Sequence, residues 1–294
     1  MKNAIIILCY NDCDTSIEYI EHIINYDSIH HLVVIDNGSI VSKRECLERK
    51  LKKIDNGKIS YIQNGNNVGY ARGNNIGIRY ALSELKVDNI IVSNTDVIYS
   101  ESTLISCINF LEEKDEVGLV SPKMVKPNGE ECMSAWKLPT YMQLLWNSLF
   151  IFKKIYNPQE YKMLSGSYSE VDVLPGSLLI GKARVWDGVG GFDEDTFLYG
   201  EESLLAYKIL KSGYKNYLLN DVFYVHAHST IINSNIRSFY KKMKYLYDAN
   251  KMFNKKCLGT NKLQDAMYFI TSYINIGTMY IYQLFKNGGT NNDE

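Results

Sequence analysis

The sequence predicts an α/β protein in which a mostly parallel central sheet is flanked by helices. Residues 4–9, 31–35 and 90–93 form short, largely apolar runs, which are typical of the inner strands of parallel sheets because those strands are buried on both faces. Between the first two runs, apolar residues recur at helical spacing, so strand, helix and strand alternate as in a parallel unit. The chain has 294 residues, of which 46% are hydrophobic, and it can therefore bury a sizeable core.

Charge and cysteine usage narrow the class of protein. The 32 Lys and Arg residues nearly balance the 33 Asp and Glu residues, so the basic surface of a dedicated nucleic-acid binder is missing and we expect no nucleic-acid partner. The six cysteines are scattered without CxxC spacing, which favours a reduced, cytoplasmic setting. The apolar start of the chain is followed by a Tyr-Asn-Asp turn rather than a cleavage site, so we interpret it as a strand and not as a signal peptide.

The first two strands end in polar residues. The first leads through Asn11 and Asp12 into a helix, and Asp is a common residue at helix starts. The second ends at Asp36, where nucleotide-binding α/β folds often place an acid that accepts hydrogen bonds from a ribose or a base. A turn or helix cap is the alternative role for Asp36.

Glycines mark the next helix. After a third strand at residues 59–62, Gly69, Gly73 and Gly77 recur every four residues, so a helix that starts near Tyr70 carries them on one face. Each costs about 1 kcal/mol relative to alanine inside a helix, so something must need the space, either a ligand or close packing on the sheet. Because these glycines follow the third strand rather than the first, they do not match the dinucleotide-binding fingerprint.

The buried strand at residues 90–93 leads directly to Asn94 and Asp96. In open α/β sheets, ligands gather beyond the carboxyl ends of the strands. Asp96 therefore lies where a nucleotide or a metal is expected. An ordinary turn is the alternative, since Asn and Asp are common turn residues.

The order of these motifs resembles the inverting family 2 glycosyltransferases with the fold called GT-A, and within them the rhamnosyltransferase-like branch. The motifs are Tyr10-Asn11, Val34-Ile35-Asp36-Asn37-Gly38-Ser39, Asn67-Val68-Gly69-Tyr70-Ala71-Arg72-Gly73-Asn74 and Asn94-Thr95-Asp96. The resemblance covers roughly residues 3–230. It implies a glycosyltransferase domain over residues 1–230, with a nucleotide-sugar half up to about residue 100 and an acceptor half over 101–230, and a helical extension over 231–294.

The resemblance also implies roles for residues on the donor side. Those that match the nucleotide-sugar site are Tyr10, Asn11, Asp36, Asn67, Gly73, Asn74 and Asn94. Among them, Asp36 matches the acid that contacts the base, and Asn94 departs from the family's Asp-any-Asp motif at its first position. Asp96 matches the direct ligand of a Mg²⁺ or Mn²⁺ ion. This agrees with the usual coordination of such cations, which are commonly held by one or two carboxylates together with substrate phosphates.

A second group of motifs implies the acceptor side. Gly190-Gly191-Phe192-Asp193-Glu194 precedes Gly200-Glu201-Glu202, and the second acid of the latter matches the family's general base. An attacking hydroxyl must lose its proton, so a carboxylate there has a chemical purpose. Glu202 is our choice, with Glu201 beside it, and stabilisation of the helix start by the two acids is the alternative. Leu204 stands where the family often has a further acid.

Histidines follow a late strand. His226 and His228 are two residues apart, so they face the same way in an extended chain. The family often has a histidine here, near the metal and the leaving group. We assign His226 to the metal, with His228 behind it. Structural histidines are the alternative.

Two uncharged segments complete the chain. Residues 138–152 are too short to cross a bilayer of about 30 Å, and we expect a core, interface or acceptor-side helix. A lysine-rich stretch then precedes residues 266–285, which carry no charge but contain several polar side chains. An amphipathic helix on a membrane surface and a dimer-forming helix are both consistent with this pattern.

The resemblance therefore implies an inverting, metal-dependent glycosyltransferase. The expected donor is dTDP-rhamnose or a UDP-hexose, and the expected acceptor is a saccharide or a lipid-linked saccharide of a surface polysaccharide, reached from the cytoplasm or the inner face of the membrane. A catalytically inactive sugar-nucleotide-binding subunit is one alternative, suggested by Asn94 and Leu204. A sugar nucleotidyltransferase is another, but the Gly-rich phosphate loop that it needs after the first strand is missing.

Overall fold

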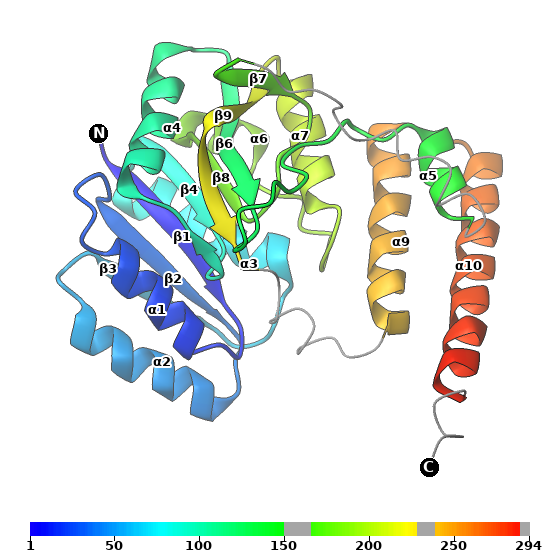
Figure 1. The fold of residues 1–294 in the computed structure, drawn as a ribbon, viewed down its shortest axis with the longest axis horizontal. Coiled ribbons are helices and arrows are strands. Elements are labelled where there is room, and N and C mark those ends of the chain that lie inside the picture. Colours follow the sequence, from blue (N-terminus) through cyan, green and yellow to red (C-terminus); the bar gives the residue numbers. More distant parts are fainter. Residues whose placement is uncertain (150–165, 228–238, 289–294) are drawn as a thin grey trace.

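The computed structural model describes residues 1–149, 166–227 and 239–288. Within these residues, a nine-stranded sheet forms the centre of the molecule (Figure 1). The strands are β1 (Asn3–Cys9), β2 (His31–Asn37), β3 (Ile59–Asn64), β4 (Asn89–Ser93), β5 (Val97–Ile98), β6 (Val117–Val125), β7 (Tyr168–Val171), β8 (Leu178–Lys182) and β9 (Lys215–His226). Their order in the sheet is β3-β2-β1-β4-β8-β6-β9-β5, and β7 pairs with β9 outside this path.

The first four strands form the parallel unit that the sequence predicts. β1 pairs in parallel with β2 and β4, and β2 pairs in parallel with β3. Along β1, Ile5 and Ile7 belong to one buried cluster, whereas Ala4 and Ile6 belong to another, because successive side chains of a strand point to opposite faces. Both faces are apolar, which explains why the strand is apolar at almost every position.

The second half of the sheet mixes directions. β8 lies antiparallel between β4 and β6, and β9 is parallel to β6. β5 and β7 pair antiparallel with β9. The sheet is mostly parallel in strand direction, as predicted, and its antiparallel strands lie on the side away from β1.

Helices cover both faces of this sheet. One buried cluster receives residues from α1 (Asp14–Ile23), α2 (Val41–Ile54) and α4 (Glu101–Glu113). The other receives residues from α3 (Tyr70–Tyr80), α6 (Ala183–Val189) and α7 (Glu201–Lys211). The predicted α/β architecture of a sheet between two helical layers is confirmed.

The glycines of α3 serve the close packing of this helix on the sheet. A Cβ atom on Gly73 would lie 2.6 Å from Leu8 Cδ1, and one on Gly77 would lie 2.5 Å from Ile6 Cγ2. Gly69 has a φ of 87° and approaches the backbone of Phe197. The expected need for space is therefore real, and at Gly73 and Gly77 the sheet fills it.

A helical pair follows the sheet along the chain. α9 (Phe239–Cys257) and α10 (Lys262–Gly288) lie side by side, and α5 (Tyr141–Asn147) lies beside α10 (Figure 1). A third apolar cluster joins these helices to α7, and it contains Leu144, Leu204, Met243, Tyr247, Phe253, Tyr268 and Ile276. Among the helices in the described part of the chain, none combines the length and the apolar character that crossing a bilayer requires.

Some predicted boundaries differ from those of the structure or lie outside the described residues. Within the uncharged segment 138–152, α5 covers seven residues, because Thr140 caps its start in a capping box with Gln143 and Ser148 ends it. Residues 150–152, the domain boundary at residue 230 and His228 lie outside the described residues.

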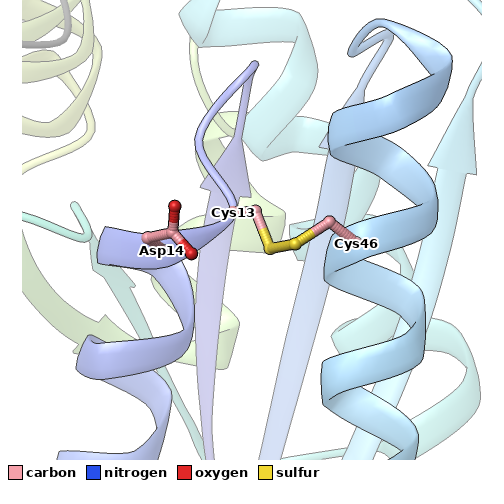
Figure 2. Close-up of side chains that lie close together, drawn as sticks. All are labelled: Cys13, Asp14 and Cys46. Carbon is pink, nitrogen blue, oxygen red and sulfur yellow. A yellow bond between two sulfur atoms is a disulfide. The ribbon is translucent and has the colours of Figure 1, made fainter.

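The expected fully reduced cysteine set needs correction. Figure 2 shows a disulfide between Cys13, directly before α1, and Cys46, on α2. Their Cα atoms are 6.2 Å apart although 33 positions separate them in sequence. The absence of CxxC spacing could not exclude this bond, because the packing of two helices, rather than local spacing, brings the sulfur atoms together. Cys9 and Cys107 are buried thiols, as their apolar surroundings predict.

Candidate active site

The carboxyl ends of β2, β1 and β4 meet at one edge of the sheet, because these neighbouring strands are parallel. The residues that follow these ends are the predicted donor-side groups. Tyr10 follows β1, Asp36 is the last residue but one of β2, and Asn94 follows β4. The fold therefore gathers segments that are distant in sequence along a single edge.

Asp36 is the residue on this edge that is predicted to contact the nucleotide base. Its side chain is fully buried, and its Oδ1 accepts a hydrogen bond of 3.1 Å from the Ser39 backbone N–H. Its Oδ2 has no hydrogen-bond partner among the described residues. A buried carboxylate oxygen normally has a partner, so this atom is positioned to accept a hydrogen bond from a ligand.

Asn11 joins the loops that follow β1 and β2. Its backbone lies in the left-handed region, with a φ of 56°, which asparagine tolerates better than most residues. Its N–H donates to Ser39 Oγ at 2.8 Å, and its Oδ1 accepts from the Ile40 N–H at 2.9 Å. These bonds hold the shape of the edge beside Asp36.

Side-chain amides hold the next loop. Asn67 Oδ1 accepts hydrogen bonds from the Gly69 N–H at 2.9 Å and from Asn37 Nδ2 at 3.1 Å. Asn37 Oδ1 in turn accepts from the Val68 N–H. Asn37 had no role in the sequence analysis, although its position directly after Asp36 in the quoted motif was a signal.

The start of α3 contains two further predicted residues. Asn74 is buried, and its Nδ2 donates to the Tyr70 carbonyl at 3.0 Å. Its Oδ1 has no hydrogen-bond partner among the described residues. Gly73 lies on the sheet side of the helix, against Leu8 and Asn37.

The structure brings together the two predicted metal ligands. His226 Nε2 lies 3.2 Å from Asp96 Oδ1, and the two side chains are only 15% and 11% exposed. The cause is strand pairing, because Val97 in β5 pairs with His226 in β9 and the Ala227 N–H donates to the Asp96 carbonyl. The Asp96 carboxylate is a ligand that suits Mn²⁺ or Mg²⁺ when phosphate oxygens and water complete the coordination, and the imidazole beside it could be a further ligand of a divalent cation.

Another cluster has the composition of a metal site. In the described part of the chain, Cys13, Asp14 and Cys46 are the group of three potential ligands whose donor atoms lie close together. Because the two sulfur atoms are bonded to each other (Figure 2), they are not available as thiolate ligands. We assign this cluster a structural role.

The two predicted acids open α7. Glu201 is buried, and its Oε2 has no hydrogen-bond partner among the described residues. Burial, and after it the charge of Glu202, raises the pKa of Glu201 well above its ordinary value. Burial also raises the pKa of Glu202, while backbone hydrogen bonds, including one from Gly176, oppose the rise.

A short loop with Gly176 and Ser177 links the acids at the start of α7 to the segment that carries Asp96. A Cβ atom on Gly176 would lie 3.0 Å from Glu202 Oε1, so glycine leaves room for the carboxylate. The Asn94 N–H donates to the Ser177 carbonyl at 2.9 Å, and Ser177 Oγ bonds the Tyr224 hydroxyl. The same loop thus contacts the segment between β4 and β5 that carries Asp96, and the helix that carries Glu202.

Tyr70 completes this connection. Its hydroxyl donates to the Gly176 carbonyl at 2.6 Å. Burial, together with the charges of Glu201, Glu202 and Asp96, raises the pKa of its phenol. Sequence reasoning missed Tyr70, Gly176 and Ser177, and the available signal was the place of Tyr70 directly after Gly69.

The predicted acceptor-side motif joins the two halves of the protein. Asn75 on α3 bonds both the N–H and the carbonyl of Phe192. Glu194 forms ion pairs with Arg72 and Arg79. The motif therefore fixes α3 against the segment before α7, and so fixes the donor edge relative to the acids.

A sheet between two helical layers, with a carboxylate and an imidazole at its carboxyl edge, is the arrangement of an α/β protein that binds its ligand beyond the ends of its strands. The family model described as "Glycosyl transferase family 2" matches residues 4–168. The chain belongs to the family 2 glycosyltransferases, and its fold is GT-A. The rhamnosyltransferase-like branch stays a prediction.

Known proteins resemble the chain along most of its length. It is 23% identical over 258 residues to the low-salt glycan biosynthesis hexosyltransferase Agl10 of Haloferax volcanii, covering 88% of this chain and 78% of that protein. The mannosyltransferase PcManGT from Pyrobaculum calidifontis, solved with GDP-Man and Mn²⁺, matches with a TM-score of 0.60 and 17% identity over 98% of this chain and 79% of its own. GalNAc-T7, solved with UDP, GalNAc and Mn²⁺, gives a TM-score of 0.60 and 13% identity over 78% of this chain and 44% of its own.

Proposed function

We propose that this glycosyltransferase moves a hexose or a rhamnose from a nucleotide-diphospho-sugar to a saccharide or lipid-linked acceptor, with inversion at the anomeric carbon. The observation that carries the proposal is the approach of His226 to Asp96, 3.2 Å apart, at the edge where the donor-side strands end. The protein would hold Mg²⁺ or Mn²⁺ through these two side chains. When bound, such a cation neutralises charge on the diphosphate leaving group.

The donor end of the site favours a base with an N–H group that can donate. The unpartnered Oδ2 of Asp36 would accept such a hydrogen bond, and the imides of uracil and thymine both supply one. This agrees with the UDP and dTDP donors expected from the sequence. PcManGT was solved with GDP-Man and GalNAc-T7 with UDP, which supports a nucleotide-sugar donor for this chain.

The acceptor end of the site requires a general base, because the attacking hydroxyl must lose its proton. In the proposed single displacement, the acceptor oxygen bonds to the anomeric carbon as the bond to the diphosphate oxygen breaks, and the acceptor proton moves to the Glu202 carboxylate. A raised carboxylate pKa suits this task, because a general base works best when its pKa is near the operating pH. Burial provides that rise, and the Gly176 backbone, which lies beside the carboxylate, opposes part of it.

An inactive sugar-nucleotide-binding subunit is the second candidate, motivated by Asn94 and Leu204. Leu204 is buried in the cluster that joins α7 to α9 and α10. Leu204 thus has a packing role there. This role explains why a leucine replaces the family's acid, and it favours the active enzyme over the inactive subunit. The division into a glycosyltransferase domain over residues 1–230 and an extension over 231–294 remains part of our proposal.

The test is a donor panel. We would titrate the protein with UDP-glucose, UDP-galactose, UDP-galactofuranose and dTDP-rhamnose in a calorimeter, with Mn²⁺, with Mg²⁺ and with EDTA, and measure release of the nucleoside diphosphate. The active enzyme should bind one donor with metal and release its diphosphate, and the anomeric configuration of the product tests inversion. Binding without release for any donor or acceptor would favour the inactive subunit.

A further inference from the structure

The outward face of α10 is apolar. Leu263, Ile270 and Ile274 are 71%, 56% and 56% exposed, and Met267 lies between them in the same helical row. Phe269 and Tyr273 are exposed beside this row, with their rings 4.4 Å apart. We call these six residues the outer face of α10, and a face of this kind on a soluble surface usually has a partner.

The inner side of the same helix carries polar groups. Ser272 and Asn275 are buried, and Asn275 Nδ2 donates to the Tyr247 hydroxyl of α9 at 2.7 Å. Thr271 bonds Ser148, next to α5. Polar side chains therefore lie between the helices beside the apolar Tyr268 and Ile276, while the large apolar side chains of the outer face point outward. An ordinary surface helix is apolar on one side only, so the packing of α10 on the other described helices does not account for the outer face.

Cations cluster on α9, the helix that packs against α10. Residues 239–288 contain eight lysines and two aspartates. On α9, the exposed lysines Lys241, Lys244, Lys251 and Lys255 recur at spacings that put them on one side of the helix, with Asp248 among them. Lys256, also on α9, forms ion pairs with Asp193 and Asp195.

The neighbouring helix adds further apolar surface. α5 contacts α10, and the Tyr141 hydroxyl donates to the Gln264 carbonyl at 2.9 Å. From α5, Met142 and Trp146 are exposed one turn apart. Tryptophan and tyrosine are characteristic of the boundary between acyl chains and headgroups.

We propose that α9 and α10 dock on an anionic lipid surface, with the outer face of α10 in the boundary between acyl chains and headgroups and the lysines of α9 on the phosphates. A lipid surface matches both the apolar face and the cations. A second copy of the chain would match only the first, because these helices offer just two acids to eight lysines. The proposal goes beyond the proposed function, and its test does not involve catalysis.

The test is sedimentation of the full-length protein with vesicles. One set contains phosphatidylcholine alone, and the other contains equal parts of phosphatidylcholine and phosphatidylglycerol. We expect binding to the anionic vesicles at low salt that weakens as salt is raised. Failure to bind the anionic vesicles at low salt would overturn the proposal.

Two pairs of variants separate the apolar and the charged contributions. Ile270→Asp should weaken binding at least tenfold, whereas Ile105→Asp, at an exposed position on α4, should leave it unchanged. Lys251→Gln with Lys255→Gln should weaken binding by roughly fivefold for each lysine, whereas Lys52→Gln with Lys53→Gln on α2 should not. Equal effects within either pair would contradict docking through this surface.

The oligomeric state tests the alternative that a second copy of the chain covers the outer face. If the protein sediments in an ultracentrifuge as a dimer, if Ile270→Asp makes it a monomer, and if vesicles do not bind it, the outer face is an interface between two copies and the lipid proposal is wrong. All variants change exposed side chains, and circular dichroism at increasing temperature checks that each one folds.

Discussion

At the scale of single residues, Asp96 is the group on which the donor site depends. Asp96→Ala should leave the fold intact and lower Mn²⁺-dependent donor affinity by at least ~10²-fold, since even residues that only orient a metal ligand contribute about 10- to 100-fold. Calorimetry with and without EDTA measures this. Asp221→Ala, an exposed acid on β9, is the matched control. Unchanged donor affinity in the presence of Mn²⁺ would contradict the metal assignment.

Glu201 and Glu202 provide a second residue-scale test. Glu202→Gln should lower turnover by about 10²- to 10⁴-fold with donor affinity unchanged, as expected when a general base is lost. Glu201→Gln should be milder, because Glu202 is the proposed base. If Glu201→Gln proves more damaging in steady-state kinetics, the base is Glu201.

Burial of Glu201 predicts a pH dependence of stability. Its folded-state pKa is raised above the ordinary 4.5, so the folded protein keeps a proton that the unfolded chain has lost. Stability therefore falls as pH rises from about 4.5 through the folded-state pKa. Glu201→Gln removes this loss, so its free energy of unfolding should gain on that of the unaltered protein between pH 5 and pH 8 in urea titrations. Glu45→Gln, at an exposed acid, should give parallel curves.

The residues that sequence reasoning identified are those with local signals. Asp36 and Asp96 stand at strand ends, and the strand pairing that brings His226 to Asp96 places two predicted residues together. Tyr70 was missed because its role depends on a hydrogen bond to Gly176, 106 positions away. No local pattern marks such a contact.

At the scale of elements, α3 shows why its glycines are needed. Gly77→Ala would place a methyl group 2.5 Å from Ile6 Cγ2 and 2.7 Å from Ile35 Cδ1. We expect a loss of about 1–3 kcal/mol in the free energy of unfolding, as for other overpacked cores. Gly277→Ala on α10 has no atom within 4 Å of the new methyl group and should gain up to about 1 kcal/mol. A gain for Gly77→Ala in urea unfolding would show that the helix can shift.

The parallel strands and the early helices were predictable because their side-chain periods are local. The antiparallel insertion of β8 between β4 and β6 was not, since β8 is a short, buried run with an apolar start and such a run does not reveal its direction. The disulfide was missed for a related reason. It depends on how α1 and α2 pack, and no spacing motif encodes that.

At the scale of the whole molecule, the pairing of β4 with β8 joins the proposed donor and acceptor halves in one sheet, and specific side-chain contacts add to it. Asn75 and Phe192 join the donor half to the segment before α7, and Leu204 joins α7 to the third apolar cluster. The proposed base therefore lies on a helix held from both sides. This arrangement is consistent with a site whose geometry depends on packing and not on the motifs alone.

The bond between Cys13 and Cys46 makes a covalent ring of the chain between them, and Asp36 and the whole of β2 lie inside that ring. A protease that cuts once in the exposed turn at Asp27 would open the ring, and the disulfide would keep the two fragments covalently joined. On a denaturing gel, the nicked protein should run as one chain without reductant and as two chains with it. Two bands without reductant would show that the cysteines are not joined.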